Sequence, residues 1–162
     1  MDLLAELAYG DEGKLYISDA LLTISVLAGG VDEEYSSEET DRIVALALAN
    51  KMFRNEAEKV KKRVFHLINS MSGGDRQAAL DRAVNSLPEE MKETAFAWAA
   101  DVIMADGDLP DESRVFIWDL AARLSVDSEI AAEIIKIMAI KNRTTAGDTK
   151  AELMRLKSPT ES

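Results

Sequence analysis

Four carboxylates stand within seven residues of this chain, at Asp106, Asp108, Asp111 and Glu112. Hard cations such as Ca²⁺ and Mg²⁺ take several oxygen ligands and little else, so a cluster of this kind suits a divalent cation. The spacing differs from that of an EF-hand loop, because Gly107 follows the first Asp directly and no Glu closes the loop. The cluster is therefore a candidate metal site of another type.

The same residues also suit the start of a helix. Asp108 is a good N-cap, Asp111 would then be the third residue of the helix, and Pro110 fits the first turn, where its missing N–H costs little. Acidic side chains there also favour the positive end of the helix dipole. Capping explains three of the four acids, so the residues alone leave both interpretations open.

Two helices must hold this acidic turn. Residues 95–104 are almost entirely apolar, which predicts a buried helix before the turn. The segment after the turn places its apolar residues on one helical face. These are Phe116, Ile117, Leu120, Ala121 and Leu124. We expect the rest of the chain to be organised around this helical hairpin.

A similar order of features occurs earlier, over residues 19–53. An apolar helix, capped by Ser18 or Asp19, ends at Gly29 and Gly30. An acidic loop that contains Asp32 follows, and Ser36 with Glu39 forms a capping box for the next helix. The chain thus contains two related hairpins, which we expect to pack together. The sequence does not decide whether their acidic turns meet at one end.

Three further helices are predicted, over 56–71, 76–87 and 128–142. The last is expected to bury Ile130, Ile134, Ile137, Met138 and Ile140. The sequence therefore predicts an all-α fold with a single domain of about seven helices. Residues 1–17 would form a lead-in, 18–142 the helical domain, and 143–162 a polar tail with a weakly amphipathic stretch at 151–156.

Two polar residues inside these helices call for a specific interpretation. Asp101 is the one charge in its apolar run, so it must be paired, hydrogen-bonded or at the exposed edge of its helix. Of these we expect the exposed edge, where it could also face the acidic turn as an outer ligand. His66 falls opposite the apolar stripe of its helix, which predicts a solvated side chain.

Composition narrows the class of protein. The chain has 162 residues and no cysteine, which excludes disulfides, thiolate metal sites and a thiol nucleophile. No segment has the apolar length of a membrane span, and acidic residues near the N-terminus argue against a signal peptide, so we expect a cytoplasmic protein. With one histidine, no nucleophile–base pair and no phosphate-binding glycine loop, the sequence favours a non-enzymatic role.

The net charge of −11 is unevenly distributed. Residues 141–162 carry five basic and three acidic side chains, a balance of +2 that leaves −13 for the first 140 residues. An acidic body repels nucleic acid and anionic lipid headgroups, and attracts cations and basic proteins.

The paired turns and their flanking helices resemble the TerB-like domain of bacterial tellurite-resistance and stress-response proteins. The resemblance covers roughly residues 18–140 and is carried by the segment 105–112 with the helices on either side. Its first-half counterpart is Leu27 to Val31 with Ser36 to Glu39. The resemblance implies an all-α domain of two similar halves with an acidic surface that holds divalent cations.

The metal ligands implied by the resemblance are Asp106, Asp108, Asp111 and Glu112. In the first half Gly29 stands where the family usually has Asp. Glu38 and Glu39 persist, and Asp32, Glu33 or Glu34 would substitute for the missing carboxylate, with Asp32 and Glu39 as the candidate ligands.

The expected function is thus a non-enzymatic divalent-cation-binding module, for Ca²⁺ or a similar ion, of a tellurite-resistance or stress-response system. Tellurite is itself an anion, so protection by an acidic protein should be indirect. The alternative is a protein-interaction domain whose acidic face binds a basic partner, or the chain's own basic tail, without a specific metal.

Overall fold

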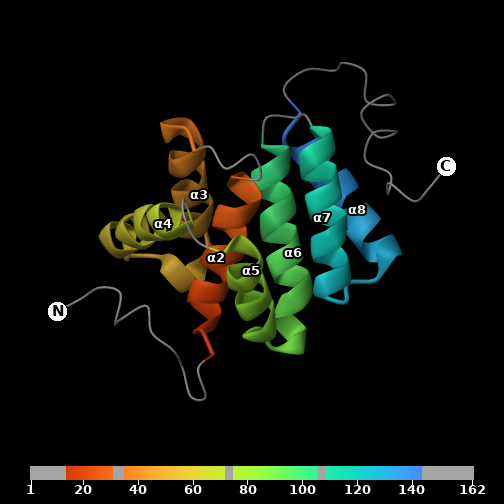
Figure 1. Ribbon diagram of the computed structural model, residues 1–162. Helices are drawn as coiled ribbons and strands as arrows, with labels where there is room; N and C mark the ends of the chain where they lie inside the picture. Colours follow the sequence, from red (N-terminus) through yellow and green to blue (C-terminus); the bar gives the residue numbers. More distant parts are fainter. Residues whose placement is uncertain (1–13, 31–34, 72–74, 106–108, 144–162) are drawn as a thin grey trace.

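The computed structural model describes residues 14–30, 35–71, 75–105 and 109–143 (Figure 1). These residues form seven α-helices and one short 3₁₀ helix, with no strand among them. The elements are α2 (Ile17–Gly29), α3 (Ser37–Ala49), η2 (Lys51–Phe53), α4 (Ala57–Met71), α5 (Arg76–Asn85), α6 (Glu89–Met104), α7 (Asp111–Arg123) and α8 (Ser128–Lys141). The predicted all-α class is confirmed.

Helix α2 lies at the centre of the bundle. It packs against α3, α4, α5, α6 and α7, and every residue from Asp19 to Ala28 is buried. The predicted buried helix is thus confirmed, but its start was wrong. The helix begins at Ile17 with Tyr16 as its N-cap, and no side chain caps it. Asp19 is therefore a buried residue of the first turn, and α2 rather than the hairpin at 95–125 is the helix around which the others are arranged.

The predicted hairpins α2–α3 and α6–α7 are both present and pack against each other through α2 and α6. The two central helices run in the same direction, so both hairpins turn at the same end of the bundle (Figure 1). A contact near the helix ends fixes this alignment. A Cβ built on Gly29 would stand 3.3 Å from Val102 Cγ1 and 2.9 Å from Ile43 Cδ1.

Helices α4 and α5 connect the two hairpins. On α4 Val60 and Val64 point inward, and on α5 Leu80 and Ala83 do so. Helix α4 packs on α3, and α5 packs on α2. His66 is half-buried, so it is less exposed than the predicted solvated side chain.

The predicted buried face of α8 was correct only in part. Ile134 and Met138 pack against the core, whereas Ile130, Ile137 and Ile140 are exposed, and the fully buried residues are Ala131, Ile135 and Ala139. Small residues let α8 approach α6, which presents the equally small Ala95 and Ala99 among its buried positions. Within the described parts of the chain, no helix has both the length and the apolarity that crossing a membrane demands.

Candidate functional site

Of the six predicted ligands, three lie in described parts of the chain. These are Asp111 and Glu112 at the start of α7 and Glu39 at the start of α3. Asp32, Asp106 and Asp108 lie outside the described residues.

Helix α7 begins differently from the capping interpretation. Its first residue is Asp111 and its N-cap is Pro110, which offers no side-chain acceptor. Asp108 therefore stands two positions before the N-cap, and the predicted cap geometry was wrong. Proline accounts for the shift, because its fixed φ and missing N–H suit the entrance of a helix.

The two carboxylates at the start of α7 point into solvent. The Asp111 side chain is 95% exposed and forms only a long ion pair, 3.7 Å from Asp111 Oδ1 to Arg114 Nη2. Glu112 is likewise exposed. An exposed ion pair of this kind contributes at most about 1 kcal/mol. Both carboxylates therefore remain accessible to a cation.

Glu39 already has a structural role. The Ser36 backbone N–H donates to Glu39 Oε2 at 2.9 Å, and the Glu39 backbone N–H donates to Ser36 Oγ at 3.1 Å. The predicted capping box is thus confirmed. A bound cation at this carboxylate would compete with the cap of α3.

A guanidinium occupies the C-terminal end of α2. Arg76 Nη2 donates to the carbonyl oxygen of Gly30 at 2.6 Å and, more weakly, to that of Leu27 at 3.5 Å. Helix C-termini present unpaired carbonyls and a partial negative charge. Arg76 therefore supplies positive charge at the first hairpin turn, where the sequence has Gly29 in place of the expected Asp.

Asp101 is paired rather than placed at an exposed edge. Lys141 Nζ lies 2.9 Å from both carboxylate oxygens, and Asn142 Nδ2 donates to Oδ1 at 3.0 Å. The Asp101 side chain is only 14% exposed. It lines a groove of about 220 Å³ with Leu46, Ala97, Trp98, Val102 and Met138. Asp101 thus ties α6 to the end of α8, and its predicted place at an open edge was wrong.

Asp19, which the sequence predicts only as a helix cap, carries a buried carboxylate. Arg63 Nη1 lies 3.4 Å from Asp19 Oδ1, and neither carboxylate oxygen has a hydrogen-bond partner among the described residues. Burial raises the pKa of Asp19 to about 6, against the opposing effect of Arg63. The signal in the sequence was the position of Asp19 next to a helix that is apolar on nearly every side.

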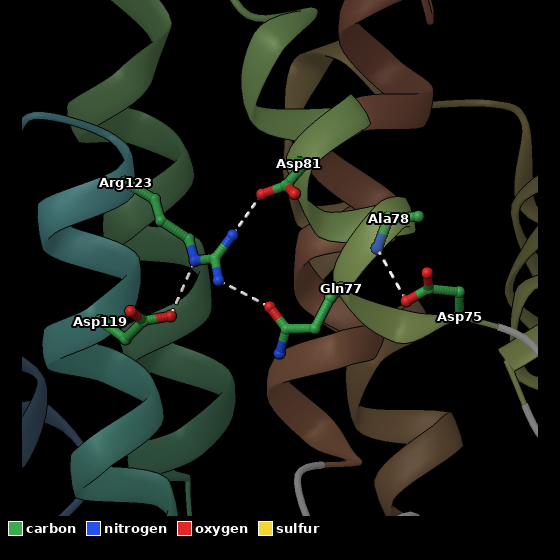
Figure 2. Close-up of polar contacts among 6 residues, drawn as sticks. All are labelled: Asp75, Gln77, Ala78, Asp81, Asp119 and Arg123. Atoms are coloured by element: carbon green, nitrogen blue, oxygen red, sulfur yellow. Dashed lines mark hydrogen bonds and ion pairs between the residues drawn. The ribbon is translucent and has the colours of Figure 1, made fainter.

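A cluster around Arg123 joins α5 to α7 (Figure 2). Arg123 Nε donates to Asp119 at 2.8 Å, Nη2 donates to Gln77 Oε1 at 2.6 Å, and Nη1 pairs with Asp81. The hydrogen bond to Asp119 is the main reason that the pKa of Arg123 is raised. Figure 2 also shows the N-cap of α5, where the Ala78 N–H donates to Asp75. This cluster is structural in character, because each of the three guanidinium nitrogens contacts a side chain of α5 or α7.

The chain was compared with protein-family models, curated proteins and solved structures. None of them matched. The resemblance to TerB-like domains, which rests on the acidic turn and its flanking helices, therefore stays a prediction. No group of three or more metal-ligating side chains occurs among the described residues, and half of the predicted ligands lie outside them.

Proposed function

We propose that this chain is a non-enzymatic module that binds a divalent cation at the end of the bundle where both hairpins turn. The observation that carries the proposal is the parallel alignment of α2 and α6, marked by the contact of Gly29 with Val102. The departure points of both acidic segments, Gly30 and Ala105, consequently lie at the same end (Figure 1).

Electrostatics support a cation at this end. The negative ends of the α2 and α6 dipoles point toward it, but the positive ends of α3 and α7 lie at the same end and offset them. The attraction for a cation therefore comes from the carboxylates, and carbonyl oxygens at the ends of α2 and α6 are suitable additional ligands for Ca²⁺. Asp111 and Glu112 add two exposed carboxylates that cap no helix through their side chains. The proposed ligand set is Asp106, Asp108, Asp111 and Glu112.

The two turns are not equivalent in this proposal. Arg76 already neutralises the carbonyl end of α2, and Glu39 is engaged in a capping box. The second turn therefore holds the principal cation, and Asp32 and Glu39 contribute less. The presence of Gly29 in place of the family's Asp is consistent with this difference between the turns. The positive charge that a second cation would bring to the first turn is already supplied by the Arg76 guanidinium.

The biological setting we propose is a bacterial stress-response system of the tellurite-resistance type. This part rests on the resemblance to TerB-like domains alone. Because the body of the protein is acidic, protection would be indirect and would not involve direct capture of the tellurite anion.

Thermal unfolding tests the metal-binding proposal. Chelator-treated protein is heated with and without Ca²⁺, Mg²⁺, Mn²⁺ or Zn²⁺ at fixed ionic strength. A ligand that binds only the native state raises stability by about 2.7 kcal/mol at a hundred times its Kd. We expect a rise in Tm with one of these ions that saturates. Equal small shifts with all ions, matched by NaCl at the same ionic strength, would contradict specific binding.

A second candidate function is favoured by a groove at the opposite end of α6. This groove of about 340 Å³ is lined by Glu89, Glu90, Lys92, Glu93, Leu124, Ser125 and Val126. Lys92 pairs with Glu89 at 2.7 Å, which leaves Glu90 and Glu93 as the carboxylates for a Lys or Arg side chain, whose stem is apolar and whose head is charged. In this case the chain is an interaction domain for a basic protein. Binding of a Lys-rich peptide that weakens with salt and is lost in Glu90→Gln/Glu93→Gln would support it.

A further inference from the structure

Helix α8 has two apolar faces, and only one of them is covered by the bundle. Ala131, Ile135 and Ala139 are buried. On the opposite face Ile130 is 37%, Ile137 58% and Ile140 46% exposed, with Ile134 half-buried beside them. A helix that is apolar on all sides is normally buried on all sides. The outer face of α8, meaning these four isoleucines, is therefore covered by the described residues only at Ile134, which packs partly against the core.

Charges on α8 are ordered along its length. Glu129 and Glu133 lie in the first half, and Lys136 and Lys141 in the second. Consider a partner helix whose acidic residues precede its basic residues in sequence. If it runs antiparallel to α8, its basic residues lie beside the glutamates of α8 and its acidic residues beside the lysines. If it runs parallel, like charges lie together.

Residues 152–157 of this chain have the required order, with Glu152 before Arg155 and Lys157. Lys150, two residues earlier, is a base outside this order. Leu153 and Leu156 are three positions apart, which places both on one face of a helix. This segment lies outside the described residues, C-terminal to α8 in the chain.

We propose that residues 150–157 dock as an antiparallel helical segment on the outer face of α8. The register that satisfies both patterns sets Leu153 against Ile137 and Leu156 against Ile134. The same register sets Lys157 against Glu133. The apolar contacts and the ion pair thus arise from one alignment.

The connection is long enough for this return. Seven residues, 143–149, separate Asn142 from Lys150. Helix–helix connections in bundles commonly have about 2–8 residues. Residues 141–162 have a net charge of +2 and the first 140 residues −13, which adds a general attraction.

A second copy of the chain is a weaker occupant of this face. Two α8 helices would also match charges when antiparallel. However, a helix of 14 residues is only about 21 Å long, and stable interfaces bury about 1,200 Å² or more. The tail is tethered, so its effective concentration reaches about millimolar without loss of translational freedom.

Engineered cysteines test the proposal cleanly, because the chain has none of its own. The variant Ile137→Cys/Leu153→Cys is oxidised under mild conditions in the full-length chain. Ala132→Cys/Leu153→Cys is the matched control, since Ala132 is exposed on a different face of the same helix. We expect the first pair to form an intramolecular disulfide at least about tenfold faster, as a local concentration effect predicts.

Equal rates for the two pairs would overturn the proposal, because a tail that samples all positions favours neither. A disulfide between chains, with a dimer in light scattering of the unmodified protein, would overturn it in favour of a second copy. Retained helical circular dichroism in both variants confirms that the fold is unchanged.

Full-length Leu153→Asp/Leu156→Asp provides an independent readout. It should increase binding of a hydrophobic dye several-fold by uncovering the isoleucines of α8. The charge-matched control Thr145→Asp/Thr149→Asp should leave dye binding unchanged. The same dye binding in all three proteins would contradict docking.

Discussion

Gly29 of α2 lies directly against Val102 of α6. A Cβ on Gly29 would stand 3.3 Å from Val102 Cγ1, so the ends of the two central helices lie close together. Because α2 and α6 run in the same direction (Figure 1), the departure points of both acidic segments are brought to one end of the bundle. This relationship is the basis of the proposed cation site.

Substitution of the next glycine should be costly. A Cβ on Gly30 would stand 2.0 Å from Tyr35 Cζ, and the Tyr35 hydroxyl donates to the Val26 carbonyl at 2.6 Å. The rigid ring must move away and lose this hydrogen bond. We expect Gly30→Ala to lower the free energy of unfolding by about 1–3 kcal/mol, the range for overpacked sites, as measured by urea denaturation.

Gly29→Ala is the control for that experiment. Its nearest contact is the flexible end of the Ile43 side chain, at 2.9 Å, and alanine favours a helix by about 1 kcal/mol over glycine. The effect of Gly29→Ala should therefore be much smaller. Equal losses in the two variants would contradict the assigned role of Tyr35.

Asp19 should make stability fall as pH rises. Its pKa is about 6 in the folded protein against an ordinary 3.8, so between these values the folded state holds a proton that the unfolded state has released. Stability then decreases from about pH 4 to about pH 6 and stays low above it. The difference of about two pKa units between the folded and unfolded states corresponds to a loss of roughly 3 kcal/mol in the free energy of unfolding. Asp19→Asn should thus be more stable than the wild type at pH 7.5 and no more stable at pH 4.

Asp101→Asn is the matched control for the pH experiment. The Asp101 carboxylate is bound by Lys141 and Asn142. At pH 7.5, Asp101→Asn should therefore lower the free energy of unfolding, whereas Asp19→Asn should raise it. Urea denaturation of all three proteins at both pH values measures the difference. A loss of stability in Asp19→Asn at pH 7.5 would show that the pair with Arg63 outweighs the cost of burial.

Arg76 should contribute through its charge as well as its hydrogen bonds. It donates to the Gly30 carbonyl at the negative end of α2, and hydrogen bonds that involve a charged group contribute about 1.5–3 kcal/mol. We expect Arg76→Gln to lose stability in this range in thermal or urea unfolding. Lys62→Gln, at an exposed position of α4, removes the same charge, and a loss of stability as large in that variant would contradict a specific role for Arg76.

The Arg123 cluster should discriminate between arginine and lysine. Three different nitrogens reach Asp119, Asp81 and Gln77 (Figure 2), and a lysine cannot reproduce this planar fork. Arg123→Lys should lose most of the stability lost in Arg123→Ala, about 1 kcal/mol for a cluster at the surface. Wild-type stability in Arg123→Lys would mean that charge alone is sufficient.

The sequence predicted which segments are helical better than which faces are buried. Helix α3 and its capping box follow from Ser36 and Glu39, and the buried face of α7 follows from clear periodicity. Helix α8 has Ala or Ile at most positions, so periodicity could not choose its buried face. The choice was made by close approach to α6, which only small residues such as Ala131 and Ala139 allow.

The candidate site was predictable in residue type but not in geometry. Pro110 moved the start of α7 two residues beyond the expected cap. The partners of Asp101 come from the end of α8, about forty residues away in the chain. A local sequence pattern does not predict a contact between residues so far apart. The guanidinium of Arg76 at the first turn is likewise a tertiary contact.

Calorimetric titration with divalent cations tests the central claim most directly. The chain supplies its own control, because α6 and α7 both begin with a buried Leu, a Pro N-cap and two exposed acids, at Glu89 and Glu90 and at Asp111 and Glu112. Chelator-treated wild type is titrated beside Asp111→Asn/Glu112→Gln and the charge-matched Glu89→Gln/Glu90→Gln. We predict saturable binding of one divalent ion by the wild type and the control, and at least about tenfold weaker binding, or 1.4 kcal/mol, in the α7 variant. Equal binding by all three proteins, or no saturable binding by the wild type, would contradict the cation site.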